Sequence, residues 1–224
     1  MKKLFSSILC LVLVLALSSC SGLLERFESI GGSLLDTSKT ENGVAQGEYT
    51  PGTVTDSDWK SAWIGLQYTL TDGFSMMSQE ELKELMDLAT GIYKDPETGK
   101  EMIDYAMVNA IYEMQAMDNM GNNIIVMAEK VNFLVNSEEK YCDALKQQLG
   151  QQTNISGTFE EPVSYTIGEI EFLRMDATQS YSGVTVYQTY LIKKYDDRMV
   201  VIIISVNDVS KIDTVLSSFA PYSE

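Results

Sequence analysis

The chain has 224 residues, of which 32 are acidic and 16 basic, so its formal net charge is −16, and it contains no histidine. A surface this acidic repels nucleic acid and anionic lipid headgroups, which excludes nucleic-acid binding. The lack of histidine excludes Ser-His-Asp and Cys-His catalysis and histidine metal sites. Since the chain also has neither a G-x-G-x-x-G sequence nor a P-loop, no nucleotide cofactor is expected.

The first 20 residues have the pattern of an export signal. Lys2 and Lys3 precede an apolar run over residues 4–17, which is shorter than the roughly 20 residues that a transmembrane helix needs. The run ends at Leu17-Ser18-Ser19-Cys20, which resembles the bacterial lipobox. That resemblance implies that residues 1–19 are removed and that Cys20 carries a diacylglycerol, so that the protein is extracytoplasmic and anchored to the cell membrane by lipid. The alternative is an ordinary secretory signal in which Cys20 is incidental.

Cleavage before Cys20 would remove two lysines and Cys10 and leave a formal charge of −18. With Cys20 blocked by lipid, Cys142 would be the remaining thiol, so the domain must fold without an internal disulfide. Cys142 lies at helical spacing from Leu145 and Leu149 and is expected to be a buried structural thiol. Residues 20–57 have no sustained apolar period, which predicts a flexible tether, and residues 58–224 are predicted to form a single monomeric globular domain without a metal.

Predicted elements begin after the tether. Alternating apolar residues predict a strand over 64–70, and Asp72-Gly73 predicts a turn into a short strand over 74–76. Ser78 and Glu81 form a capping box, which with apolar residues at helical spacing predicts an amphipathic helix over 79–93. A second, shorter helix is predicted over 101–108.

The second half of the chain is rich in predicted strands. Two strands, 111–117 and 123–131, are joined by a turn, and Ser137 opens a helix that carries Tyr141, Leu145 and Leu149. The remaining predicted strands and the closing helix cover 169–175, 184–194, 199–206 and 209–219. Residues 124–127 and 200–204 are continuously apolar, so both faces of those strands should be covered. Because hairpins join most strands, we predict a mainly antiparallel sheet with helices on both faces, a three-layer α/β/α sandwich of α+β class.

Several groups of residues resemble the PsbP-like family, which includes small bacterial lipoproteins. They are Gly65-Leu66-Gln67-Tyr68-Thr69-Leu70 with Asp72-Gly73-Phe74 and Ser78, Met114-Gln115-Ala116 with Asn122-Asn123-Ile124-Ile125-Val126, and the final strand pair from Tyr187 to Val206. The resemblance spans residues 59–220 and departs from the family at Asp72 and in the long segment 94–109. It implies a fold and not a reaction, and because family members bind proteins, it implies an interaction role.

Two sequences match the S-x-x-K pattern of serine–lysine enzymes, Ser57 with Lys60 and Ser137 with Lys140. The companion S-D-N and K-T-G elements are missing. Ser137 is explained as a helix cap, so no catalytic residue is predicted.

Two groups of residues are candidate metal ligands. Met114, Met117 and Met120 have a spacing that suits Cu(I), but Met114 and Met117 would face opposite sides of a strand, so they are predicted to fill the core. Asp56 with Asp58, and Glu160 with Glu161, offer oxygen atoms to calcium without the order of an EF-hand loop, so solvated surface is expected.

Aromatic residues on or beside strands are expected to be mostly core, but a patch left open would suit a partner. The residues predicted for such a patch are Trp59, Trp63, Tyr105 and Tyr112, with the 94–109 segment as its natural location. The sequence thus predicts a lipid-anchored interaction module that binds another envelope protein. The alternative is a cell-envelope hydrolase that uses carboxylate or Ser/Lys chemistry.

Overall fold

The computed structural model describes residues 48–86, 92–94, 101–103, 108–131, 135–151, 156–181 and 183–223. The helices in these ranges are α3 (Gln79–Leu85), α4 (Glu138–Gly150) and α5 (Lys211–Leu216). The strands of the large sheet are β4 (Phe74–Met76), β7 (Ala110–Asp118), β8 (Asn123–Lys130), β9 (Ser156–Phe159), β10 (Val163–Ile167), β11 (Ile170–Tyr181), β12 (Val184–Tyr195) and β13 (Arg198–Val206). The strands of the small sheet are β1 (Thr53–Val54), β2 (Asp58–Ser61), β3 (Leu66–Thr69) and β14 (Phe219–Pro221), and β5 (Ile92–Lys94) pairs with β6 (Glu101–Ile103).

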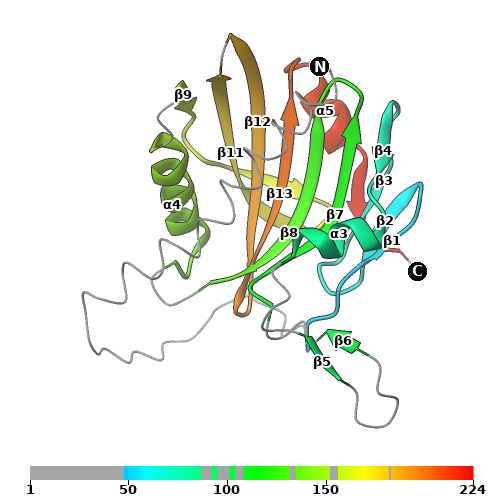
Figure 1. The fold of residues 1–224 in the computed structure, drawn as a ribbon. Coiled ribbons are helices and arrows are strands. Elements are labelled where there is room, and N and C mark those ends of the chain that lie inside the picture. Colours follow the sequence, from blue (N-terminus) through cyan, green and yellow to red (C-terminus); the bar gives the residue numbers. More distant parts are fainter. Residues whose placement is uncertain are drawn as a thin grey trace, which may run out of the picture.

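The large sheet runs in the order β10-β11-β12-β13-β8-β7-β4, with β9 also paired to β11 (Figure 1). Every strand pair in the described residues is antiparallel. Strand β13 lies in the middle and is buried along its whole length. Its alternate residues enter two separate hydrophobic clusters, because successive side chains of a strand point to opposite faces.

One face of the large sheet is covered by the small sheet and by α5. Trp59 and Tyr68 from the small sheet, and Ile212 from α5, pack with Val200 and Ile202 of β13. Strand β14 pairs with β3 at one edge of the small sheet, which joins the end of the domain to its beginning. This face therefore has a second β-sheet as most of its cover.

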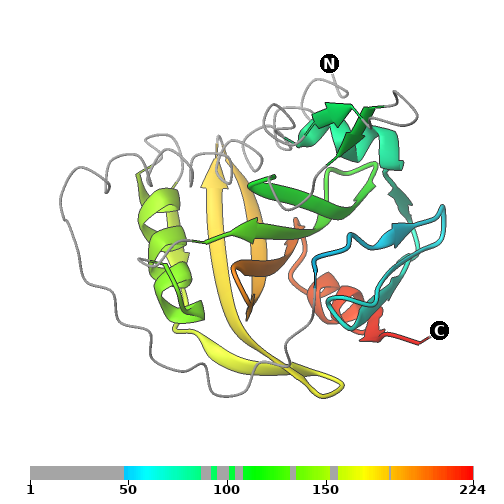
Figure 2. The ribbon, with the colours of Figure 1, turned by 90° about the horizontal axis from the view of Figure 1, so that it is seen from below.

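The other face of the large sheet carries α3 and α4. Helix α3 packs on β7, and α4 packs on β9, β11 and β12. Seen from below the view of Figure 1, these helices lie on the opposite side of the sheet from α5 and the small sheet (Figure 2). The mainly antiparallel sheet is confirmed, but the prediction of helices on both faces is only partly right, since short strands near each end of the domain supply much of one layer.

Two predicted helices differ from the structure, the first in its end and the second in its beginning. The helix predicted over 79–93 ends at Leu85, and 92–94 is strand β5. The helix predicted over 101–108 begins instead with strand β6 at 101–103. The pairing of these two strands is a tertiary contact, which overrides the local apolar spacing. At the end of the domain, the predicted helix over 209–219 is shortened to α5, and Phe219 belongs to β14.

The folded part of the chain also begins earlier than expected. The sequence pattern places residues 48–57 in the tether, yet they contain β1 and Tyr49, whose ring lies 4.9 Å from that of Trp63 in an edge-to-face contact. The capping box of Ser78 and the burial of Cys142 are confirmed. Within the described residues, no helix has both the length and the apolar character that a membrane span requires.

Candidate functional site

The face of the large sheet that carries α3 and α4, here called the α3–α4 face, has an apolar middle. Ile125 and Met127 of β8, and Val201 and Ile203 of β13, are at most 1% exposed and belong to one cluster with the inner side of both helices. The described helices reach this face from its two sides, over β7 and over β11 and β12. Neither of them has its main contacts with β8 or β13, which lie between.

A row of uncharged polar side chains crosses the α3–α4 face at one end of its strands. Asn123 is paired in register with Ser205, and Ser205 with Gln188. Gln115 on β7 and Gln179 on β11 extend the row diagonally, because their strand positions alternate onto the same face as Ile125 and Met175. We call these five residues the amide row.

Some side chains of the amide row form hydrogen bonds with other side chains of the domain. The Gln188 side chain donates to Ser205 Oγ at 3.0 Å and accepts from the hydroxyl of Tyr190 at 3.0 Å. By contrast, Asn123 Oδ1 and Gln179 Nε2 are buried and have no hydrogen-bond partner. Asn123 is fully buried, so its bare oxygen costs about 1–3 kcal/mol. A ligand that donates a hydrogen bond there would recover that energy.

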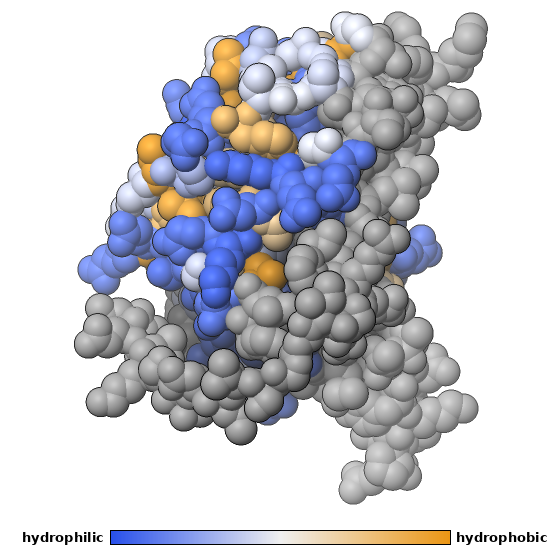
Figure 3. Space-filling model, turned by 90° about the vertical axis from the view of Figure 1, so that its left-hand side faces the viewer, coloured by the Kyte–Doolittle hydropathy of each residue, from blue (hydrophilic) through white to orange (hydrophobic). Residues whose placement is uncertain are grey.

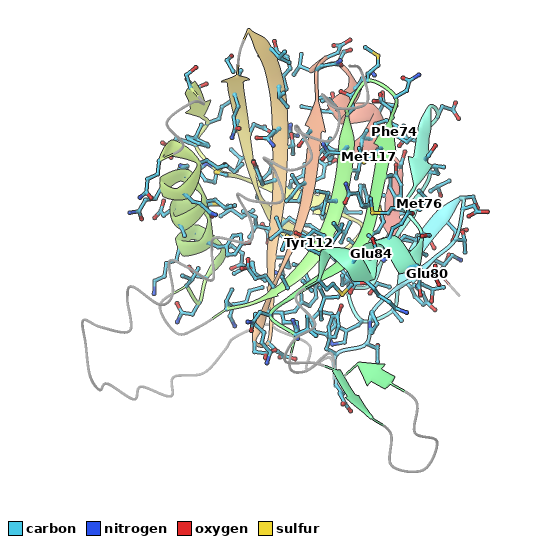
Figure 4. The ribbon with its side chains drawn as sticks, viewed as in Figure 1. Phe74, Met76, Glu80, Glu84, Tyr112 and Met117 are labelled. Carbon is cyan, nitrogen blue, oxygen red and sulfur yellow. The ribbon has the colours of Figure 1, made fainter. Side chains whose placement is uncertain are left out.

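The side of the face formed by β7 and α3 combines apolar and acidic groups. Figure 4 shows Tyr112 and Met117 on β7 and Glu80 and Glu84 on α3, with Tyr112 beside the end of the helix that carries Glu84, whereas Phe74 and Met76 on β4 pack into the cluster on the opposite face. Met117 is half-buried, whereas both glutamates are exposed. This side therefore offers hydrophobic contact at the sheet and negative charge at the helix.

The end of the face opposite the amide row holds a buried acid. Tyr141 on α4 donates a hydrogen bond of 2.6 Å to Glu129 on β8. Burial raises the pKa of Glu129 to about 7, and only the bond from Tyr141 opposes that rise. Burial, together with the charge of Glu129, raises the pKa of Tyr112 to about 12. Glu129 is therefore a carboxyl group that changes its charge near neutral pH.

A second buried acid lies on the opposite face and has a structural explanation. Glu113 sits at a β-bulge in β7 and accepts hydrogen bonds from Tyr49 Oη, the Gly52 amide at 2.6 Å and Trp59 Nε1 at 3.4 Å. Arg198 lies over the Tyr49 ring at 4.7 Å from its centre. Burial raises the pKa of Glu113, although these bonds and Arg198 act in the other direction. These contacts hold Tyr49 and Gly52, near the start of the described residues, against β7.

The predicted aromatic partner surface is not supported by the structure. Trp59, Trp63 and Tyr112 are at most 5% exposed, since all three pack into the hydrophobic clusters on the two faces of the sheet. Tyr105 and most of the 94–109 segment lie outside the described residues. Figure 3, which looks at the side with α4, shows mostly hydrophilic residues among those coloured, with hydrophobic ones in small separate patches.

Neither S-x-x-K sequence forms a serine–lysine pair. Ser137 caps α4 by accepting from the Lys140 amide, and the Lys140 ammonium donates to Asn136 at 2.9 Å. The Lys60 ammonium donates to the carbonyl of Ser223 at 3.3 Å. The expectation that Ser137 serves as a helix cap is confirmed.

The candidate metal ligands are also separated. Met114 is buried on the small-sheet face, Met117 alternates onto the α3–α4 face, and Met120 is 63% exposed in the turn that follows. In the part of the chain that the structure describes, no three Cys, Asp or Glu side chains are grouped so that they could hold a metal ion.

Sequence reasoning missed the amide row and Glu129. A signal was present, because Gln115, Asn123, Gln188 and Ser205 are polar residues within or at the ends of strongly apolar strands. That they share one row depends on strand register, which the sequence alone did not give.

No protein-family model matches the chain, and the comparison with curated proteins finds no match. Several solved structures match the chain, including the following two. The solution structure of the cyanobacterial PsbP (CyanoP) from Synechocystis sp. PCC 6803 has a TM-score of 0.43 and 9% identity, with 78% of this chain and 98% of that chain covered. The crystal structure of LpqN, involved in cell envelope biogenesis of Mycobacterium tuberculosis, has a TM-score of 0.35 and 10% identity, with 70% of this chain and 83% of that chain covered. The architecture described above therefore stands on the strand pairing, and the PsbP-like family stays a resemblance.

Proposed function

We propose that this protein is a binding module of the bacterial cell envelope, anchored by lipid at Cys20, and that it binds another envelope protein through the α3–α4 face. One observation carries the choice of face. A fully buried polar atom, Asn123 Oδ1, lacks a partner in the same row where its neighbours Ser205 and Gln188 are hydrogen-bonded. Buried polar groups are nearly always satisfied, so an exception of this kind calls for an explanation, and a ligand group that bonds there is the one that we propose.

Among the described residues, the rest of the surface supports this choice because it shows no large hydrophobic patch. The large hydrophobic side chains that are exposed, among them Met120, Val163 and Val209, lie singly on different elements. Scattered residues of this kind are ordinary on a soluble domain and do not make a docking patch. Anchoring by two acyl chains would hold the domain at the membrane surface, where envelope proteins are at high local concentration.

Site-specific photocrosslinking in living cells tests the proposal. A photoreactive phenylalanine analogue is placed at Met117, which is half-buried on the α3–α4 face, and at Val209, which is 56% exposed before α5. We expect a discrete crosslinked protein from Met117 that is absent from Val209. Equal crosslinking from both positions, or none from Met117, would remove the support for this face.

A second candidate function, hydrolysis of an envelope polymer, is favoured by Glu129. A carboxyl group with a pKa near neutral suits general acid–base catalysis, and Tyr141 and Tyr112 lie beside it. Release of dye from labelled peptidoglycan measures this activity. Release that is lost in Glu129→Gln, while the folded state is retained, would favour the enzyme over the binding module.

A further inference from the structure

Strand β10 lies at an edge of the large sheet. It pairs with β11 on one side and comes last in the strand order, so its other side has no strand beside it in the part of the chain that the structure describes. With five residues, it is the longest of the edge strands in those residues. Figure 2 shows the hairpin of β10 and β11, in yellow, at the margin of the domain. An edge of this kind presents a row of backbone groups to which another strand can bond.

The turn between β10 and β11 determines which backbone groups point outward. Ile167 and Ile170 pair across a two-residue turn, so this closing pair exchanges both of its backbone hydrogen bonds. Bonded and non-bonded pairs alternate along an antiparallel ladder, so Ser164 and Thr166 turn their N–H and C=O groups away from β11. Among the described residues, these four backbone groups have no hydrogen-bond partner. They are therefore available to an added strand.

Strand β10 lacks the features that protect a sheet edge from pairing. Such features are charged residues, prolines and bulges within the strand. Residues 163–167 contain no charged residue and no proline, and their pairing with β11 has no shift of register. Pro162 precedes the strand and has no N–H to offer, and a Cβ on Gly168 after the strand would lie 2.3 Å from Pro221 of β14. These two ends leave room for a partner segment of about five residues.

The surroundings of this edge are acidic. Residues 156–181, which include β9, β10 and β11, contain five acidic residues and one arginine, a formal charge of −4. The arginine, Arg174, is paired with Asp176 at 2.9 Å. The other four acidic residues are exposed, and they are Glu160, Glu161, Glu169 and Glu171. A second copy of the chain would bring the same charge to the edge and be repelled, whereas a basic segment would be attracted.

The two sides of β10 differ in polarity. Val163, which is 56% exposed, and the half-buried Tyr165 point to the side of the small sheet. Ser164 and Thr166 are exposed on the other side, where Glu171 stands opposite Thr166 in register. An added strand continues this alternation. Its apolar residues would lie beside Val163 and Tyr165, and its basic residues would lie on the side of Glu171.

We infer that the β10 edge binds an extended, basic segment of a partner protein as an added antiparallel strand. The segment is about five residues long, and basic residues alternate in it with β-branched apolar ones. Every strand pair in the described residues is antiparallel, and antiparallel pairing is the more stable kind. Backbone bonds to Ser164 and Thr166 supply affinity, and the alternating side chains supply specificity. This edge is a different surface from the α3–α4 face, so neither proposal depends on the other.

Backbone methylation of a peptide tests the inference. The probe is an acetylated, fluorescent six-residue peptide in which lysine and valine alternate, and the protein is the chain carrying Cys20→Ser. In an antiparallel added strand, the lysines lie opposite Ser164 and Thr166, and the lysine N–H groups face β10. We therefore expect the peptide with three N-methylated lysine amides to have a Kd at least about tenfold higher than the isomer with three N-methylated valine amides, as measured by fluorescence anisotropy.

Amide hydrogen exchange tests where the peptide binds. Saturating peptide should slow exchange of the Ser164 and Thr166 amides about tenfold or more, whereas the Tyr165 amide, which bonds to β11, should not change. Thr166→Pro should abolish binding and keep the fold, because the N–H that it removes points away from the sheet, and Thr166→Val is its matched control. If Thr166→Pro does not fold, the two methylated peptides and the exchange rates still decide.

Matched charge reversals separate the edge from the general acidity of the protein. Glu160→Lys with Glu161→Lys, just before β10, should raise the Kd of the unmethylated peptide about fivefold. Glu80→Lys with Glu84→Lys, on the exposed side of α3, should leave it nearly unchanged.

Several results would overturn the inference. They are equal binding of the two methylated isomers or the reverse order of their affinities, unchanged exchange of the Ser164 and Thr166 amides, and equal binding of a peptide with glutamate in place of lysine. Self-association of the chain that slows the same two amides would show that a second copy occupies the edge. Binding seen only after deletion of residues 21–47 would show that the chain occupies its own edge. Crosslinks from Met117 test the other surface and are independent of these outcomes.

Discussion

Replacing Glu129 by glutamine should change how the stability of the domain depends on pH. In the folded protein, burial raises the pKa of this carboxyl to about 7, against a value of 4.5 without the protein environment. Between these two values, the unfolded chain has released its proton and the folded chain still holds it. The contribution of Glu129 to stability is therefore fully present below about pH 4.5 and is lost as the pH rises through about 7.

The size of the effect follows from the two pKa values. A difference of roughly 2.5 pH units corresponds to about 3 kcal/mol of unfolding free energy. Glutamine keeps an oxygen that can accept from Tyr141 Oη and carries no charge, so Glu129→Gln should behave like the protonated wild type. At pH 8 the variant should be more stable than the wild type by up to about 3 kcal/mol, and near pH 4.5 the two should agree within about 1 kcal/mol.

Urea unfolding at pH 4.5 and pH 8, followed by the fluorescence of the buried Trp59 and Trp63, measures these differences. Glu84→Gln is the matched control, because Glu84 is an exposed carboxyl and its removal should leave the pH dependence unchanged. If the stability of Glu129→Gln falls with pH in parallel with the wild type, Glu129 is not held protonated by burial and the reasoning is refuted.

Three further outcomes are expected. Gly52→Ala should destabilise the domain by about 1–3 kcal/mol in thermal unfolding, because a Cβ there would lie 2.4 Å from Trp59 Nε1. Gly150→Ala is the control and should be nearly neutral, because no atom lies within 4 Å of the added Cβ. Equal effects of the two substitutions would show that Gly52 is not tightly packed. Ser78→Ala should cost about 1 kcal/mol by removing the capping box of α3, and an unchanged urea midpoint would show that this helix does not depend on its cap. Cys20→Ala should abolish membrane retention, and undiminished labelling of the variant by a fatty-acid probe would rule out the lipobox.

Local patterns predicted the features that depend on neighbouring residues. The capping box of Ser78, the helix that begins after Ser137 and the apolar strand around Ile202 follow from side chains a few residues apart, so their periods can be seen in the sequence. The same reasoning gave the wrong end for the helix predicted over 79–93, which stops at Leu85. Residues 92–94 pair with 101–103, and a strand partner seven to eleven residues away is not part of a helical period.

The residues of the candidate site depend on contacts between distant parts of the chain even more than the helices and strands do. Asn123, Gln188 and Ser205 come from three strands separated by up to 82 positions in the chain, and they form a row because β8, β13 and β12 pair in one register. A shift of one residue would move each of these side chains to the opposite face. Trp59 is an example of a residue that the sequence places on a partner surface because it is aromatic. In the structure, β2 pairs with β3 and Trp59 is completely buried.

By itself, the sequence determined the acidic charge, the absence of histidine chemistry, the lipobox-like start and the antiparallel class of the sheet, because these depend on composition and on short-range order. Only the tertiary structure decided which layer covers each face, where Glu129 and Glu113 are buried, and that polar side chains from separate strands meet on the α3–α4 face. Burial and hydrogen-bond pairing depend on contacts between residues that are far apart in the chain. Those contacts set the pKa values and leave Asn123 Oδ1 without a hydrogen-bond partner, and both proposals for function depend on them.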